Sequence, residues 1–352
     1  MPKITFMGAG STVFARNVLG DCMCTEALRD SELALYDIDP VRLAESRDIL
    51  TAMNETKGGH ARISAYLGAE NRKEALRGAD FVVNAIQVGG YDPCTITDFE
   101  IPKQFGLRQT IGDTLGIGGI MRALRTIPVL TDFARDMEEV CPDAWFLNYT
   151  NPMSMLTGYM LRYTGVKTVG LCHSVQVCAS HLMQMLGMEY DDTVQWKIAG
   201  INHQAFYTQF LWNGKDAYPL IKKAITENPE IYNEELVRNE MFLALGYYVT
   251  ESSGHNSEYC AWFRKRPDLI EKYCTHGTGW NPGVYAYILG EYRNRETTWK
   301  TQIEEWFQKP VELERGKEYA ASIFNAIFGD GTLFKFNGNV RNFGLIDNLP
   351  QG

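Results

Sequence analysis

The chain has 352 residues, 45% of them hydrophobic, so it can bury a large core and is long enough for two domains. Its formal net charge is −9, with 34 Lys and Arg against 43 Asp and Glu. Because nucleic acids and anionic membranes attract basic surfaces, this balance argues against both as partners and favours a small-molecule ligand.

The N-terminal stretch MPKITFMGAGS has neither the charged start nor the long apolar run of a signal peptide. No apolar run approaches the roughly 20 residues of a membrane span. The eight cysteines are scattered, with no CxxC pair and without the density of a disulfide scaffold. We therefore expect a cytoplasmic protein with reduced thiols, most of which pack as small apolar side chains.

In chain order, the first half alternates apolar, β-branched runs with helical stretches. Strands are expected in KITFMGAG, ELALYDID, ADFVVNAIQVGG, AWFLNYTNP and KTVGLCHS. Helices are expected in RLAESRDILTAM, RALRTIPVLTDFARDMEEV and PMSMLTGYMLRY. This alternation predicts an α/β fold with a parallel, doubly wound sheet.

From about Trp196 the pattern changes. The stretch KIAGINHQAFYTQFLWNG predicts longer antiparallel strands with a turn at Asn213-Gly214, and helices are expected around residues 216–247 and 297–328. We therefore predict one domain over residues 1–196 and an α+β lobe over 197–352.

The first motif with chemical meaning is GAGSTVF, directly after the first expected strand. Gly8 and Gly10 allow the close backbone approach of a pyrophosphate, with Ser11 at the start of a helix, although Val13 replaces the usual third glycine. A plain strand-to-helix turn is the alternative. The second strand, however, ends in LYDIDP, where Asp37 can bond a ribose diol and favour NAD over NADP. Together these features predict a Rossmann-like NAD site.

The third strand ends in NAIQVGG, so Asn84 and Gln87 are candidates to line the cofactor. Ligands of open α/β sheets bind at the carboxyl edge of the strands, where both residues are expected. The alternative is a glycine turn that closes a buried strand.

Cys172 and His203 each follow a strand pattern closely, in GLCHS and GINH. A thiolate and an imidazole could hold a divalent transition ion whose remaining ligands are substrate oxygens, whereas two protein ligands cannot close a structural zinc site. The alternative is that both are buried packing residues, because the sequence alone does not show that they meet.

Several motifs occur together and in order: GAGS, YDID, NAIQVGGY, TDFEIPKQFGLRQTIGDTLGIGGIMRALRTIP, NYTNP, GLCHS, GINH, VTESSGHNSEY and, near the end, FNGNVRNFGLIDNLPQ. As a set they resemble the NAD- and metal-dependent family 4 glycoside hydrolases, and within them the α-galactosidase (melibiase) branch. This family is an exception to the usual two-carboxylate glycosidases. The resemblance covers most of the chain.

The resemblance implies hydrolysis of terminal α-galactosides of the melibiose or raffinose type. In such enzymes NAD+ takes a hydride from C3 of the sugar, a base removes the C2 proton, the aglycone is eliminated from C1, water adds, and NADH returns the hydride. A divalent ion, usually manganese, binds the C2 and C3 oxygens. The alternatives are an α-glucosidase or α-galacturonidase of the same family, a net sugar or hydroxy-acid dehydrogenase, and a non-catalytic NAD sensor.

By the same resemblance, Cys172 and His203 are the metal ligands. Asn148 and Asn151 of LNYTNP lie beside the nicotinamide and the sugar hydroxyls, where an amide can donate and accept; an asparagine that caps the turn is the alternative. His173 would donate a proton to the leaving oxygen or orient the substrate.

The resemblance places the C2 base on a tyrosine of the second lobe. Of Tyr247, Tyr248 and Tyr259, we favour Tyr259 because His255 and Glu258 surround it with polar groups. A phenol needs a nearby cation to act as a base near neutral pH. The alternative for each tyrosine is packing within the lobe.

Asp113, in TIGDTLG, is expected to accept hydrogen bonds from a sugar hydroxyl. A 6-phosphosugar pocket would require several cations, whereas Arg122 and Arg125 have the spacing of a solvated helix face. The sequence therefore favours an unphosphorylated galactoside.

Two features depart from the family. Where relatives have a Tyr-Pro-Arg-Arg type segment, this chain reads CTHGTGWNPGVYAYILGEY, so Arg293 or Arg295 would have to substitute. Relatives also continue beyond the equivalent of NLPQG, so we expect a lobe truncated at its C-terminus. The family resemblance further implies a homo-oligomer, a dimer or a tetramer.

Overall fold

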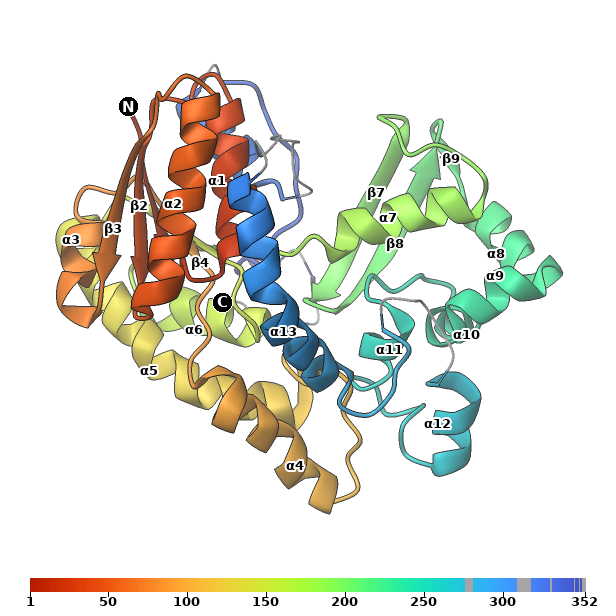
Figure 1. The fold of residues 1–352 in the computed structure, drawn as a ribbon. Coiled ribbons are helices and arrows are strands. Elements are labelled where there is room, and N and C mark those ends of the chain that lie inside the picture. Colours follow the sequence, from red (N-terminus) through yellow and green to blue (C-terminus); the bar gives the residue numbers. More distant parts are fainter. Residues whose placement is uncertain (276–280, 309–317, 330, 345, 348, 350–352) are drawn as a thin grey trace. The chain divides into compact units, whose positions relative to one another are not determined.

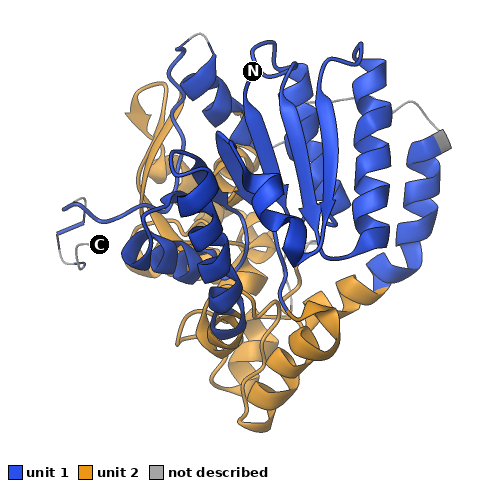
Figure 2. Cartoon of the chain, turned by 90° about the vertical axis from the view of Figure 1, so that its left-hand side faces the viewer, with its two compact units in different colours: residues 1–88, 123–171, 294–352 blue, residues 89–122, 172–293 orange. Residues whose placement is uncertain are grey.

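The computed structural model describes residues 1–275, 281–308, 318–329, 331–344, 346–347 and 349, which form two compact units (Figure 1; Figure 2). Unit 1 comprises residues 1–88, 123–171 and 294–352, and unit 2 comprises residues 89–122 and 172–293. Each unit is thus assembled from separate segments, unlike the predicted domains 1–196 and 197–352, whose boundary stays a prediction. Among the described residues, no helix has both the length and the apolar character that crossing a membrane requires.

Unit 1 is built on six parallel strands in the order β3-β2-β1-β4-β5-β6. The strands are β1 (Lys3–Met7), β2 (Glu32–Asp37), β3 (Arg62–Leu67), β4 (Phe81–Asn84), β5 (Trp145–Asn148) and β6 (Lys167–Gly170). The predicted doubly wound, Rossmann-like sheet is therefore confirmed. The sequence did not reveal β3, because this edge strand is only half-buried and lacks the continuous apolar run of the others.

Helices of unit 1 pack on both faces of this sheet and create two separate cores. Along β4, Phe81 and Val83 join one core whereas Val82 joins the other, because successive side chains of a strand point to opposite faces. The first core includes residues of α1 (Thr12–Cys24), α2 (Pro40–Thr56), α13 (Tyr287–Gln308) and α14 (Ala320–Phe328). The second includes residues of α3 (Arg72–Leu76), α5 (Gly116–Val140) and α6 (Met153–Tyr163).

The carboxyl ends of the central strands lie at one level. Met7 pairs with Asn84, Asn84 with Asn148, and Asn148 with Gly170. Because β1 and β4 are neighbours whose connections run in opposite directions along the sheet, this edge has the position at which open α/β sheets bind ligands.

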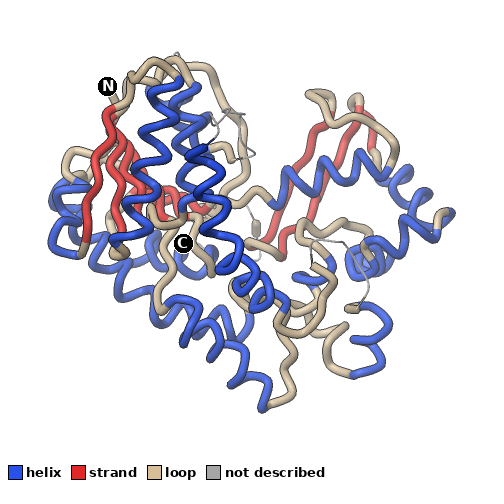
Figure 3. Tube along the Cα trace, viewed as in Figure 1, coloured by secondary structure: helices blue, strands red, loops and turns tan. Residues whose placement is uncertain are grey.

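Unit 2 contains an antiparallel sheet of β7 (Val194–Ile201), β8 (Gln204–Trp212) and β9 (Lys215–Asp216), as predicted (Figure 3). The predicted turn at Asn213-Gly214 is present, with φ of +50° and +71°. Helices follow within the predicted range 216–247, and a core forms between β8, α7, α8 and α10. The helices of this unit, besides the first turns of α5 and α13, are α4 (Ile96–Gln104), α7 (Ser174–Met185), α8 (Tyr218–Glu227), α9 (Pro229–Glu234), α10 (Leu236–Leu245), α11 (Ser253–Asn256) and α12 (Pro267–Tyr273).

Two shorter segments complete the order, a 3-10 turn at Ala69–Asn71 and a π-helical turn at Gly90–Thr95. The helix predicted over 297–328 corresponds to the later part of α13 and to α14, and the residues between them, 309–317, lie outside the described chain.

Candidate functional site

The glycine turn after β1 is shaped by close backbone contacts. Gly8 has φ +89°, and a Cβ on it would lie 2.7 Å from the carbonyl oxygen of Ala85. A Cβ on Gly10 would lie 2.8 Å from Asp37 Oδ2. Any larger residue at either position would collide with its neighbours, so both glycines are required by the local geometry.

Asp37 is fixed beside this turn. Its Oδ2 accepts a hydrogen bond from the Gly10 N–H at 2.6 Å, and its Oδ1 accepts from Ile38 and Asp39 at 2.7 and 2.9 Å. A carboxylate has about four acceptor sites, so capacity for a ribose hydroxyl remains. Ser11, exposed at the start of α1, makes no side-chain cap bond to the described helix, which leaves the helix N-terminus suited to a pyrophosphate.

Asn84 and Asn148 form a buried amide pair at the same edge, and both are completely buried. Asn84 Nδ2 donates to Asn148 Oδ1 at 2.9 Å and to Thr150 Oγ1 at 3.1 Å. Within the described residues, Asn84 Oδ1 has no hydrogen-bond partner. An orphaned buried acceptor costs about 1–3 kcal/mol, so this atom fits a donor supplied by a ligand.

Asn148 itself is engaged by the protein: Nδ2 donates to Thr157 Oγ1 at 3.1 Å, and Oδ1 accepts from the Thr150 N–H at 3.1 Å. Asn151 Oδ1 accepts from the Met153 N–H at 3.2 Å, so the turn-capping role is present. Gln87 is exposed. Direct contacts of these side chains with nicotinamide or sugar stay predictions.

Cys172 and His203 meet in space, although the sequence separates them widely. Cys172 lies two residues after β6, and its Sγ is 3.4 Å from Nε2 of His203. His203 lies in the turn between β7 and β8 with φ +62°, in the left-handed region. A non-glycine residue there costs of order 1–3 kcal/mol, a strain that is common at functional sites.

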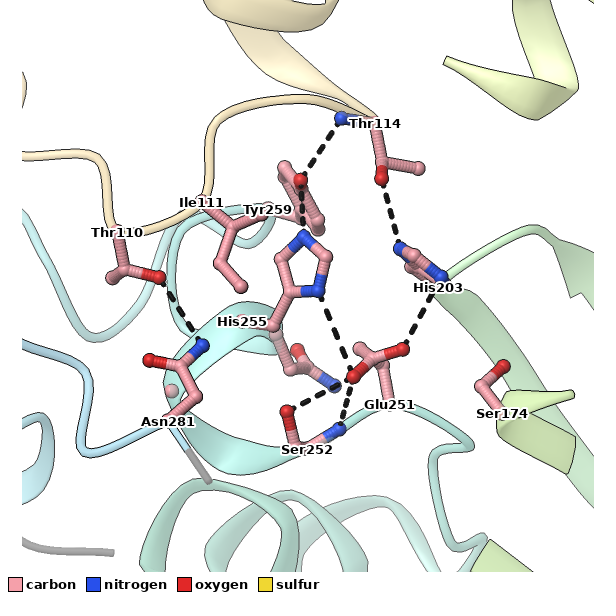
Figure 4. A network of polar contacts seen from close by, with 12 residues as sticks. Thr110, Ile111, Thr114, Ser174, His203, Glu251, Ser252, His255, Tyr259 and Asn281 are labelled. Carbon is pink, nitrogen blue, oxygen red and sulfur yellow. Dashed lines mark hydrogen bonds and ion pairs between the residues drawn. The ribbon is translucent and has the colours of Figure 1, made fainter. Parts of the chain in front are cut away.

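Glu251 lies near the same ring nitrogen of His203 as Cys172, Nε2. Its Oε2 is 3.3 Å from His203 Nε2, and both side chains are at least 90% buried (Figure 4). Its Oε1 accepts from the backbone N–H and the hydroxyl of Ser252 at 2.8 and 2.9 Å, and is 3.6 Å from His255 Nδ1.

A second group of polar side chains lies near the other ring nitrogen of His203, Nδ1. His203 Nδ1 is 2.9 Å from Thr114 Oγ1, and the Thr114 hydroxyl donates to Asp113 Oδ1 at 2.7 Å. Asp113, His203 and His255 have ligand atoms within 4.8 Å of one another, a spacing that could also hold a metal ion. The donor chemistry around His203 therefore fits a divalent cation.

The favoured tyrosine belongs to this network. The hydroxyl of Tyr259 accepts from the Thr114 N–H at 3.1 Å and lies 2.6 Å from His255 Nε2 (Figure 4). Tyr248, in contrast, donates to Asn239 within a buried core, and Tyr247 is 49% exposed.

The preceding carboxylate, Glu258, fixes the loop that carries Asp113 and Thr114. It accepts three successive backbone N–H groups at 2.7, 3.2 and 3.0 Å, those of Thr110, Ile111 and Gly112.

The buried charges of the cluster compensate one another. Burial alone would raise the pKa of Asp113, but its interactions with His255 and Arg122 hold that pKa well below its ordinary value. Burial is likewise outweighed at Glu251, whose pKa is lowered by His203 and His255. Burial would lower the pKa of His255, but Asp113, Glu251 and Glu258 raise it to about 10. Burial, Glu258 and Asp113 raise the pKa of Tyr259 well above its ordinary value.

The prediction that Arg122 lies on a solvated helix face is wrong. Arg122 is 8% exposed, its Nη1 is 3.7 Å from Asp113 Oδ2, and its Nη2 donates to Thr95 Oγ1 at 3.3 Å. A buried guanidinium requires such partners, so its i, i+3 relation to Arg125 was no guide to exposure. Arg125 is half-buried, and its Nε donates to the Val88 carbonyl at 2.9 Å.

Two residues of the network were missed by the sequence reasoning, Thr114 and Glu251. The four-residue spacing of Glu251, His255 and Tyr259 is a signal that could have revealed Glu251, because such spacing places side chains on one helical face. Thr114 has no comparable signal.

His173, directly after Cys172, is exposed.

In the segment that departs from the family, residues 276–280 lie outside the described chain. Arg293 Nε donates to the Tyr91 hydroxyl at 3.2 Å, and Arg295 is exposed. Whether either arginine substitutes for the missing one stays a prediction.

Comparison with known proteins identifies the family of the chain. Residues 3–188 match the family 4 glycosyl hydrolases and residues 198–352 match the C-terminal domain of the same family. The chain is 52% identical over its full length to an α-galactosidase of Bacillus subtilis, covering 79% of that protein, and 36% identical to an α-galactosidase of Rhizobium meliloti, covering 71%.

Among solved structures, LplD of Bacillus subtilis matches with a TM-score of 0.84 and 26% identity over 100% of this chain and 82% of LplD. A 6-phospho-α-glucosidase from gut microorganisms, solved with NAD and Mn2+, matches with a TM-score of 0.79 and 19% identity over 99% of this chain and 80% of that one. Both matched segments together span nearly the whole chain, which therefore belongs to the family 4 glycosyl hydrolases.

Proposed function

We propose that this protein hydrolyses terminal α-galactosides with the help of bound NAD and a divalent metal ion. Manganese is the first candidate for that ion. The observation that carries the proposal is the 52% identity, over the full chain, to the α-galactosidase of Bacillus subtilis. The pairing of Cys172 with His203 supports it, because a net dehydrogenase of the same fold needs no such ligand pair.

Both groups fit the residues that are present. Gly8, Gly10 and Asp37 would hold the dinucleotide, which supplies a transient hydride acceptor at the sugar. Cys172 and His203 would hold the cation, which supplies a Lewis acid for the sugar hydroxyl oxygens. A thiolate ligand requires a reducing environment, in agreement with the predicted cytoplasmic location.

We assign proton transfer and hydroxyl binding to polar side chains of unit 2. Tyr259 would take the C2 proton: its hydroxyl is held by the Thr114 N–H and by His255, and the bound cation would lower the pKa that burial and Glu258 raise. Asp113 would accept a sugar hydroxyl, since its carboxylate is kept ionised by Arg122 and His255. His173, exposed at the start of α7, would serve the leaving oxygen.

The substrate is proposed to be an unphosphorylated galactoside. Arg122, a buried cation beside Asp113, is engaged by that carboxylate and by Thr95, so its charge is already compensated. A phosphate dianion would require further cations. The predicted homo-oligomer stays part of this proposal.

The test is hydrolysis of an aryl α-galactoside under reducing conditions, with NAD+ and Mn2+ supplied together, singly or not at all. We expect turnover only with both, and none in Cys172→Ser. Activity that is indifferent to both additives would contradict the mechanism. Parallel assays with an aryl α-glucoside and an aryl α-galacturonide show which sugar configuration is cleaved. Steady accumulation of NADH absorbance near 340 nm with free galactose would instead indicate a dehydrogenase.

A further inference from the structure

The hydroxyl of Thr114 determines where the proton of neutral His203 lies. A threonine hydroxyl has one hydrogen, and here it is donated to Asp113 Oδ1 at 2.7 Å. The contact of 2.9 Å between Thr114 Oγ1 and His203 Nδ1 then requires a hydrogen on Nδ1. Neutral His203 consequently presents an unprotonated Nε2 to the opposite side.

On that opposite side, Nε2 faces two further electron-pair donors. Cys172 Sγ lies 3.4 Å from it, and Glu251 Oε2 lies 3.3 Å from it. Metal bonds of about 2.0–2.3 Å at angles between 90° and tetrahedral place neighbouring ligand atoms about 2.8–3.8 Å apart. Both separations fall inside this range.

The hydrogen bonds of Glu251 hold its carboxylate so that Oε2 faces Nε2 of His203. Its Oε1 accepts twice from Ser252 and also faces His255, whereas Oε2 is directed at His203 (Figure 4). The side chain is 7% exposed, so water does little to compensate its charge.

We propose that Glu251 is a third protein donor to the divalent ion, bound through Oε2 beside Cys172 Sγ and His203 Nε2. The proposal rests on the metal dependence of the proposed function and extends its ligand set. A set of one sulfur, one nitrogen and one oxygen suits transition ions such as manganese, cobalt and zinc rather than magnesium or calcium. Three protein donors leave positions open for a pair of sugar hydroxyls.

The competing set, Asp113, His203 and His255, is less suited to the ion. His203 Nδ1 is engaged by Thr114 at 2.9 Å, and His255 Nε2 is engaged by the Tyr259 hydroxyl at 2.6 Å. An ion bound to His203 Nδ1 would have to displace the Thr114 contact and would lack a sulfur ligand.

The experiment is a Mn2+ titration of the purified, reduced, full-length chain with NAD+ present, in which electron paramagnetic resonance measures free Mn2+. We expect Glu251→Gln to weaken Mn2+ binding about 100-fold or more, since it neutralises a ligand while keeping its shape. The matched control is Glu240→Gln, a carboxylate of the same unit that is bonded to Tyr232; its affinity should equal that of the wild type.

An unchanged affinity in a folded Glu251→Gln protein would overturn the proposal. So would a loss confined to His255→Gln, which would place the ion on the Asp113 side. If Glu251→Gln does not fold, anomalous diffraction from wild-type crystals soaked in Mn2+ decides: a peak bonded to Glu251 Oε2 supports the assignment, and a peak bonded to Asp113 overturns it.

These readouts are independent of turnover. A protein that binds Mn2+ through Glu251 but does not cleave α-galactosides would refute the proposed function alone. A protein that cleaves them with full Mn2+ affinity in Glu251→Gln would refute only the ligand assignment.

Discussion

Replacing Thr114 with valine tests how the protein orients His203, the proposed metal ligand. Thr114 is completely buried, and valine preserves its branched shape while deleting the hydroxyl between Asp113 Oδ1 and His203 Nδ1. The buried Nδ1–H would then lack its acceptor, at a cost of about 1–3 kcal/mol. Neutral His203 would instead favour a proton on Nε2, donated to Glu251 Oε2 at 3.3 Å, and that tautomer cannot bind an ion.

The magnitude follows from two independent considerations. Loss of an outer partner of a metal-binding histidine typically weakens metal affinity 10–100-fold. That range corresponds to about 1.4–2.8 kcal/mol, which overlaps the cost of the unpaired N–H. We therefore expect the Mn2+ dissociation constant of Thr114→Val to rise 10–100-fold.

The assay is Mn2+ titration of the wild type, Thr114→Val and Thr114→Ser, with thermal unfolding of each protein without metal. Thr114→Ser retains the hydroxyl and should bind Mn2+ within a few-fold of the wild type. If Thr114→Val folds and binds Mn2+ as tightly as the wild type, the hydroxyl does not orient His203 and the reasoning fails.

Asp37→Asn should weaken NAD+ binding about tenfold in a fluorescence titration, because the ribose loses a charged acceptor; equal affinity would exclude Asp37 from the site. Chelation should abolish aryl α-galactoside hydrolysis and added Mn2+ should restore it in the wild type but not in Cys172→Ser. Tyr259→Phe should lower kcat at least 100-fold and suppress exchange of the C2 proton with solvent deuterium. Tyr248→Phe should keep kcat but lose about 1 kcal/mol of stability in thermal unfolding, since it deletes only the bond to Asn239; a reversed pattern would assign the base to Tyr248.

The fold could be predicted to the extent that burial leaves a periodic pattern. The central strands β1, β4 and β5 are covered on both faces, so their residues are apolar almost without interruption, and they were recognised. The edge strand β3 has no such run and was missed. The prediction for Arg122 failed for a related reason, because spacing along a helix gives the angle of a side chain but not what covers it.

The candidate site could be predicted where each residue belongs to a local motif. Gly8 and Gly10 lie in the turn after β1 and Asp37 ends β2, and the structure places Asp37 beside that turn. Cys172 and His203 required the resemblance to a family, because nothing in their separate strand ends shows that their side chains meet. Glu251 and Thr114 act through contacts between distant segments, which no single stretch of sequence records.

The loop that carries Thr114 connects the proposed base to the orientation of the proposed metal ligand, His203. Tyr259 accepts the Thr114 N–H, and the hydroxyl of Thr114 contacts His203. Removing the Tyr259 hydroxyl therefore deletes a proton acceptor and also one of the bonds that hold Thr114. A fall in kcat of Tyr259→Phe at low Mn2+ would combine the two effects, whereas saturating Mn2+ compensates for the second. The C2 exchange rate measured at saturating Mn2+ is consequently the quantity that separates a catalytic tyrosine from a positioning one.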